Sequence, residues 1–132
     1  MKLESETVQV SASLKEVKAF LSQPANYWEL LPQDKVSEFK HDDTSCSFKA
    51  QGGVVISLVY QGERENEVLL KSGEKSPFPF TLVIHLNQLE KGIEGNLQFD
   101  GEVNMFLKMM VEKPLLALFN YMSKKLKEHF DK

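Results

Sequence analysis

Hydrophobic periodicity changes within residues 8–21, which have the sequence VQVSASLKEVKAFL. Valine alternates with polar residues at the start of this stretch, which predicts a strand over about residues 3–11. Ser13 and Glu16 then have the spacing of a capping box, in which hydroxyl and carboxylate each satisfy a free backbone amide of a helix start. Apolar residues follow at helical spacing, and Pro24 ends the pattern. The stretch therefore predicts a strand that runs directly into a short helix.

A second short helix and a series of strands are predicted downstream. Residues 26–31 lie between Pro24 and Pro32 and have room for one or two helical turns. From residue 36 to residue 103 apolar residues recur at every second position, and turn residues interrupt the pattern at intervals. Short turns join antiparallel neighbours, so we expect a meander. Its six strands are predicted at Val36–His41, Ser45–Gln51, Val54–Gln61, Glu65–Lys71, Phe80–Leu89 and Ile93–Val103.

The alternation assigns the two faces of this sheet. One face is apolar and is expected to be covered: Cys46, Phe48, Ala50, Val54, Ile56, Leu58, Tyr60, Phe80, Leu82, Ile84, Leu86, Leu97, Phe99 and Val103. The opposite face is polar and is expected to be wet, with Ser57, Thr81, His85, Asn96 and Asp100 among its members.

The cover must come from residues 104–130, the only long segment left. Apolar residues recur there at three- and four-residue spacing, from Leu115 and Phe119 to Met122 and beyond, which predicts an amphipathic helix. Pro114 either opens this helix or kinks a longer one that starts near Asn104, and we favour a kinked or two-part helix. Four of the five methionines, Met105, Met109, Met110 and Met122, fall in this segment. We expect them to face the sheet, as core filling or as a pliable lid over an apolar guest.

This order of elements resembles the helix-grip fold of the START-like (SRPBCC) superfamily, which includes polyketide cyclases and the birch pollen allergen. The resemblance covers nearly the whole chain. It is most specific at residues 8–21, followed by Pro24 and by Leu31-Pro32. It implies an α+β fold in which a seven-stranded curved antiparallel sheet wraps around a long C-terminal helix, with two short helices between strands 1 and 2. It also implies an apolar ligand between sheet and helix.

Length and composition limit the class of protein. The 132 residues suit one domain, 1–132, that buries a core without disulfides or metal. The single cysteine, Cys46, and the lack of a signal-peptide-like apolar run favour the cytoplasm. No stretch approaches the ~20 apolar residues of a membrane span, so we expect no membrane insertion. Arg64 is the only arginine and the net charge is -3, so nucleic acid is not expected as a partner.

The residues that could carry chemistry mostly have simpler structural roles. The histidines, His41, His85 and His129, share no face and lack metal-ligand spacing, so we expect no metal and no cofactor. Cys46 faces inward with nothing nearby to activate it, as an inert thiol would. The ligand-binding set is predicted from the inward faces of the sheet and the long helix, where concave apolar sites form. It comprises Phe48, Ile56, Leu58, Tyr60, Phe80, Leu82, Leu97, Phe99, Leu115, Phe119 and Met122.

Three functions remain open. We favour binding of a small apolar or amphipathic molecule, lipid-like or polyketide-like, without catalysis, because the inward face has no acid–base pair. The alternative is an enzyme of the polyketide cyclase or dehydratase type, in which Tyr60 and His41 would polarise a carbonyl and move protons. The third is an interaction module that docks a protein partner, or a second copy, through Trp28 or the exposed sheet face.

Overall fold

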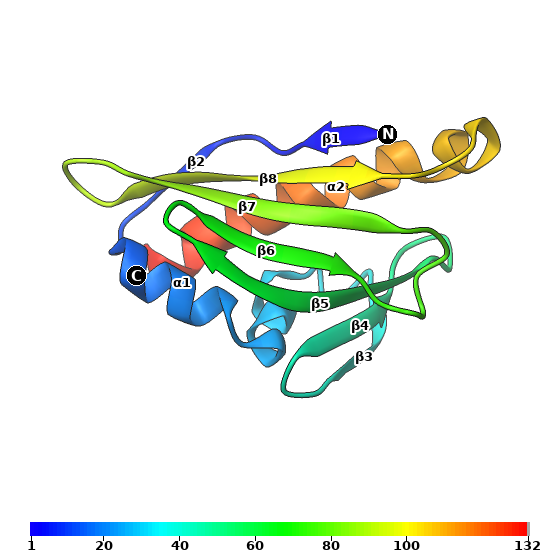
Figure 1. The fold of residues 1–132 in the computed structure, drawn as a ribbon, viewed down its shortest axis with the longest axis horizontal. Helices are drawn as coiled ribbons and strands as arrows, with labels where there is room; N and C mark the ends of the chain where they lie inside the picture. Colours follow the sequence, from blue (N-terminus) through cyan, green and yellow to red (C-terminus); the bar gives the residue numbers. More distant parts are fainter. Residues whose placement is uncertain (132) are drawn as a thin grey trace.

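The computed structural model of the chain describes residues 1–131 and has the predicted order of elements (Figure 1). Two short strands open the chain, α1 and the 3₁₀ helix η1 follow, six strands come next, and the long helix α2 ends it. The helices are α1 (Leu14–Leu21), η1 (Pro24–Leu30) and α2 (Met105–Phe130). The strands are β1 (Lys2–Glu4), β2 (Val8–Val10), β3 (Ser37–His41), β4 (Ser45–Lys49), β5 (Val55–Arg64), β6 (Glu67–Ser72), β7 (Phe80–Gln88) and β8 (Ile93–Gly101).

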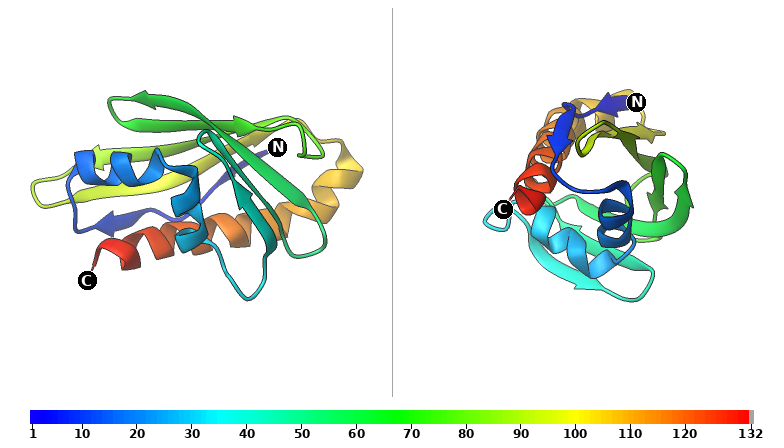
Figure 2. Two further views of the ribbon diagram at one scale, coloured as in Figure 1. Left: turned by 90° about the horizontal axis from the view of Figure 1, so that it is seen from below. Right: turned by 90° about the vertical axis from the view of Figure 1, so that its left-hand side faces the viewer.

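All eight strands form one antiparallel sheet. Its order is β1-β8-β7-β6-β5-β4-β3, and β2 also pairs with β8. Each strand from β3 to β8 therefore neighbours the next along the chain, as a meander requires, and the N-terminal segment returns to the far edge. Seen end-on, the sheet curls around an interior, and α2 runs along its open side (Figure 2). The helix packs against β1, β2 and β8 on one side and against η1 on the other.

The N-terminal strand is split, so the sheet has eight strands where seven were expected. Leu3 pairs with Phe99 and Val8 pairs with Gly95, which leaves one extra residue on the N-terminal segment. At the break, the amide of Ser5 donates to the carbonyl of Leu97, and the Ser5 hydroxyl accepts from the Leu97 amide at 2.8 Å. This side-chain contact takes the place of a ladder bond, as at a β-bulge.

The hairpin between β5 and β6 turns later than predicted. We expected the turn at Gly62-Glu63, but β5 continues to Arg64, which pairs with Glu67 across a two-residue turn. Gly62 has a φ of 103°, and the register shifts between it and Tyr60. The glycine therefore accommodates a bulge within the strand, because its lack of a Cβ atom permits that backbone conformation.

The helix start at Ser13 is confirmed as a capping box. The Ser13 hydroxyl accepts from the Glu16 amide at 3.1 Å, and the Glu16 carboxylate accepts from the Ser13 amide at 3.2 Å. The apolar face of α1 buries Val17 and Leu21 completely. The next turn, η1, buries Tyr27, whose hydroxyl donates to the Leu21 carbonyl at 2.9 Å and so ties η1 to α1.

The C-terminal helix begins after Asn104, as the longer of the two alternatives predicted, but it is one uninterrupted helix and is not divided into two parts. The Asn104 side chain caps it by accepting from the Leu107 amide at 2.8 Å, and Pro114 lies inside it. Its buried residues are Val111, Leu115, Leu118, Phe119, Met122, Ser123 and Leu126. No helix among residues 1–131 contains a stretch long and apolar enough to cross a membrane.

The expected position of the methionines is wrong for three of the four. Met122 is buried, but Met105, Met109 and Met110 are exposed at 76%, 83% and 56%. They lie in the first turns of α2, which extend past the end of β8 (Figure 1). No strand within residues 1–131 lies opposite these turns, so the three exposed methionines do not fill the core.

Two residues of the expected wet face are buried by other parts of the chain. Ser57 is covered by the loop between β6 and β7, where the Ser76 hydroxyl accepts from its amide at 2.9 Å. Asn96 is covered by β1, and its side-chain amide donates to the Glu4 carboxylate at 3.0 Å. The rest of this face is mostly polar and open, as Asp100 illustrates.

Candidate functional site

The predicted ligand-binding set lies almost entirely in the core. Ten of its eleven members are at most 5% exposed: Phe48, Ile56, Leu58, Phe80, Leu82, Leu97, Phe99, Leu115, Phe119 and Met122. The structure thus brings strands and helix together as expected, and rings occupy the space between them. The centroid of Phe99 lies 5.0 Å from that of Phe80 and 5.3 Å from that of Phe119. Phe78, from the loop before β7, is also buried and packs edge-on against Phe99 at 6.2 Å.

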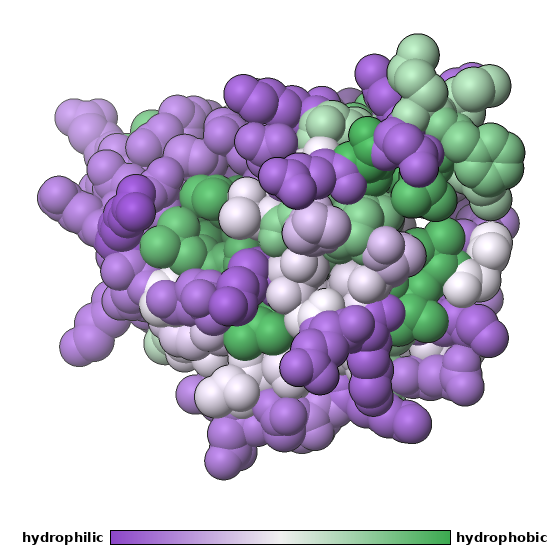
Figure 3. Space-filling model, turned by 45° about the vertical axis from the view of Figure 1, so that its right-hand side comes forward, coloured by the Kyte–Doolittle hydropathy of each residue, from purple (hydrophilic) through white to green (hydrophobic). Residues whose placement is uncertain are grey.

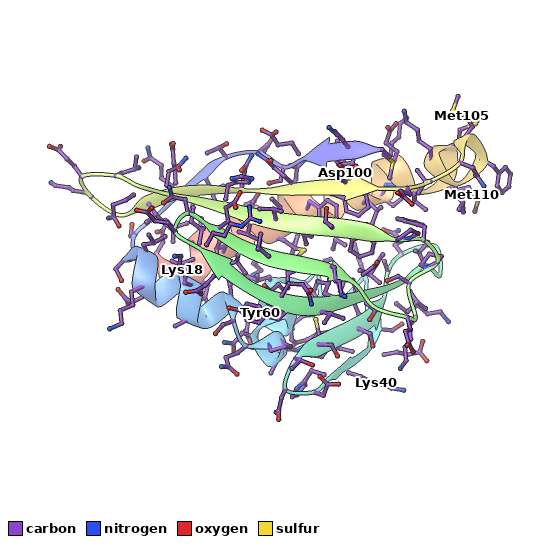
Figure 4. The ribbon with its side chains drawn as sticks, in the orientation of Figure 1. Lys18, Lys40, Tyr60, Asp100, Met105 and Met110 are labelled. Atoms are coloured by element: carbon purple, nitrogen blue, oxygen red, sulfur yellow. The ribbon has the colours of Figure 1, made fainter. Side chains whose placement is uncertain are left out.

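Tyr60, the eleventh member, is only partly buried, contrary to the expectation of a buried phenol on the inward face. Its hydroxyl donates to the Glu63 carboxylate at 3.5 Å. Partial burial and the nearby Glu63 charge raise the pKa of Tyr60, so the phenol stays protonated at neutral pH. Tyr60 borders an open groove with Lys18 of α1 (Figure 4). The buried phenol is that of Tyr27, which the sequence did not single out.

The structure has an apolar pocket where α2 passes the edge of the curled sheet. It has a volume of about 110 Å³ and lies between the middle of α2, the segment after η1 and the turn between β4 and β5. We call it the mouth; its lining is Pro32, Lys35, Val36, Gln51, Pro114, Ala117, Leu118 and Tyr121. Lys35 and Gln51 are exposed and supply polar groups at the rim.

Two residues of the core cluster line the mouth. Val36 and Leu118 belong to the core cluster, yet at 8% and 7% they retain more exposure than most of its members. None of the eight residues was predicted as a site. One feature of the helix sequence indicated the pocket. Pro114, Ala117 and Tyr121 recur at three- and four-residue spacing beside the buried residues of α2. The contributions of Pro32, Val36 and Gln51 depend on how the sheet curls, which periodicity does not specify.

The groups that the enzyme alternative needs are not brought together. Tyr60 borders the groove against α1, whereas His41 borders a separate depression on β3 and β4 and lies 6.0 Å from the Phe39 ring. Within residues 1–131, no three His, Cys, Asp or Glu side chains are grouped to hold a metal ion.

Cys46 has the environment of an inert thiol, as predicted. It is buried on β4, and burial together with the negative charge of Asp42 raises the pKa of its thiol to about 12. The thiolate is the reactive form of cysteine. At neutral pH Cys46 therefore remains a thiol and does not act as a nucleophile.

Solved structures with the same arrangement identify the fold. A START superfamily protein from Mycobacterium smegmatis superposes with a TM-score of 0.69 at 16% identity, over 98% of this chain and 97% of its own. A protein from Thermus thermophilus gives 0.77 at 14% identity, over 98% and 97%. The chain has the START-like helix-grip fold. The chain matches no protein-family model and no curated protein sequence.

A third similar structure is that of a protein from a biosynthetic pathway. The di-domain ARO/CYC StfQ from the steffimycin biosynthetic pathway gives a TM-score of 0.71 at 9% identity, over 98% of this chain and 50% of its own. At such identities the likeness concerns the backbone arrangement, because fold and chemistry separate readily. The likeness therefore concerns how α2 lies against the open side of the sheet. It does not assign a ligand to the mouth.

Proposed function

We propose that the chain binds one small apolar or amphipathic molecule, lipid-like or polyketide-like, whose apolar end enters at the mouth. The observation that carries this proposal is that the core reaches the surface there, at Val36 and Leu118, in a concave apolar setting. Ligand sites are typically concave and apolar with few polar groups, and Lys35 and Gln51 at the rim fit that description. The volume suits a small ring or a chain end, since whole-ligand sites occupy roughly 300–1,000 Å³.

The proposed site lies between sheet and helix, at the edge of the curled sheet and away from the aromatic rings at the centre of the core. A larger guest would have to displace side chains such as Leu118 inward. The predicted set around Phe99 and Phe119 would then be the deeper wall of an expanded site. We propose binding without chemistry, carried out by a single domain in the cytoplasm, where a lone buried cysteine is compatible with reducing conditions.

A dye-binding experiment tests the mouth. Nile red, a neutral apolar dye, should bind the purified chain with a rise in fluorescence. Ala117→Trp should weaken this binding at least tenfold, because the indole would occupy the pocket. Ala117 is exposed, so the substitution should leave the melting temperature within about 2 °C of the parent.

Lys124→Trp is the matched control, since Lys124 is an exposed residue of the same helix outside the mouth. It adds an indole to the same element and should keep the parent affinity. Equal affinities for the two tryptophan variants, or no dye binding by the parent, would remove the mouth as the binding site.

A further inference from the structure

The first two turns of α2 carry an exposed cluster of large apolar side chains, which we call the apolar tip. Its members are Met105, Phe106, Met109 and Met110, exposed at 76%, 71%, 83% and 56%. They are all the large hydrophobic residues that are exposed among residues 1–131. Met105 and Met110 lie beyond the end of the sheet in Figure 4, and Figure 3 shows pale green side chains protruding at the upper right of the molecule. Such concentration on one protrusion differs from the scattered apolar exposure of ordinary surfaces.

The fold does not need apolar residues at these four positions. Leu107, Val111 and Leu115 follow one another at four-residue spacing and take the core-facing side of the helix, and Val111 and Leu115 are buried. The four tip residues lie on the remaining sides, where polar residues would serve the helix equally well. Core packing therefore does not account for the apolar residues of the tip.

The tip continues along the helix toward the mouth. Phe106, Met110, Pro114, Ala117 and Tyr121 recur at three- and four-residue spacing, which places them on one side of α2. The last three line the mouth. An apolar stripe thus connects the protruding end of the helix with the pocket.

We propose that the apolar tip docks the protein on a neutral lipid surface, with the Met and Phe side chains inserted among the acyl chains. Its exposed area is about 570 Å², taking roughly 200 Å² for each fully exposed residue. A stable protein interface needs about 800 Å² from each partner, so the tip alone falls short of a dimer interface. A bilayer imposes no shape complementarity and accepts a convex apolar protrusion.

The charges of the segment indicate which lipid surface is suitable. Lys108 and Glu112 are the only charged residues between positions 104 and 112, and they pair at 3.7 Å. The tip therefore carries little net charge, which favours zwitterionic lipid over an anionic surface. This proposal revises the expectation of no membrane insertion, which rested on the lack of a spanning segment. Shallow docking needs no such segment.

Vesicle flotation tests the tip directly. The parent chain should float with phosphatidylcholine vesicles, equally at 0.1 M and 0.5 M NaCl, because apolar insertion is not screened by salt. A variant with glutamine at positions 105, 106, 109 and 110 should partition at least tenfold more weakly. Its melting temperature should match the parent, since all four side chains are exposed. A second variant with leucine at the same four positions should keep floating.

Three outcomes would overturn lipid docking. The first is failure of the parent to float. The second is flotation that requires anionic lipid and disappears in 0.5 M NaCl. The third is a parent dimer in sedimentation velocity that the glutamine variant abolishes, with no flotation by the parent, which would assign the tip to a second copy.

The proposal stands apart from ligand binding at the mouth. Ala117→Trp should lose Nile red binding and still float, whereas the glutamine variant should keep Nile red binding and lose flotation. If the parent binds no dye but floats, the mouth proposal fails alone and lipid docking is retained.

Discussion

Replacing Phe99 with Ala should lower the free energy of unfolding by about 4–5 kcal/mol, near the top of the range for such truncations. The Phe99 side chain lies at the centre of the interior at 2% exposure. Its ring meets those of Phe80, Phe119 and Phe78 within 6.2 Å. Truncation of a buried Phe costs about 3–5 kcal/mol, and each aromatic pair adds roughly 0.5–1.5 kcal/mol to the stability beyond its buried area.

The surroundings of Phe99 are expected to relax little. A Cβ atom added at Gly101 would lie 2.8 Å from the Phe99 ring, so the backbone two residues further along β8 approaches this ring closely. Backbone cannot collapse into a vacated space as a side chain can, so most of the cavity should remain. A loss of this size exceeds a quarter of the stability of a typical domain, which is roughly 5–15 kcal/mol.

Urea denaturation followed by tryptophan fluorescence provides the assay. Trp28 is the only tryptophan and packs 5.3 Å from Phe39, so its emission should report loss of tertiary structure. Phe99→Leu is the matched control and should cost less than about 2 kcal/mol, because it keeps most of the apolar volume. A loss below about 2 kcal/mol for the alanine variant, at an unchanged urea slope, would mean that the ring borders empty space. The description of a filled interior would then be refuted.

Three further changes test local features. Ser13→Ala should lower stability by about 1 kcal/mol through loss of the capping box, measured as a lower urea midpoint; an unchanged midpoint would show that the cap contributes nothing. Cys46 should resist iodoacetamide at pH 8 in the folded chain and react after denaturation, because burial raises its pKa to about 12; modification of the native chain at the rate of a free thiol would contradict this. The pKa of Asp42 lies below its usual value because the Thr44 amide and the Ser45 hydroxyl and amide donate to the carboxylate. The stabilisation that follows from this lowered pKa is present above the unfolded pKa and is lost as the pH falls through the folded pKa. Asp42→Asn should therefore reduce the fall in stability at acid pH; an unchanged fall would exclude this role.

The elements that local chemistry determines were predicted well. The capping box at Ser13 and Glu16, and the strands with clear alternation, depend on neighbouring residues, and the structure confirms them. The turn after β5 was misplaced because Gly62 suits a bulge as well as a turn. Local sequence does not distinguish these uses, since both exploit a positive φ at glycine. Pairing with β6 decides between them.

The sequence predicted which residues of the strands face the interior, but not where a pocket forms. Alternation correctly assigned Phe80 and Phe99 to the inward face, because a pleated strand leaves no other choice. Whether such residues enclose a space depends on what fills it from elsewhere, and Phe78 enters from a loop that has no periodicity. The mouth depends on the same long-range geometry, since it joins Val36, Gln51 and Ala117 from distant parts of the chain.

The exposed methionines follow from a mismatch between the lengths of α2 and β8. The nine residues of β8 span about 30 Å at roughly 3.4 Å each, whereas the 26 residues of α2 span about 39 Å at 1.5 Å each. Helix and strand run alongside one another in Figure 1, so about 9 Å of helix, or six residues, lacks a strand opposite it. Six residues is the length of the segment from Met105 to Met110. Helical periodicity shows which residues are apolar but not where the opposing sheet ends, and the apolar tip of this protein lies in that difference.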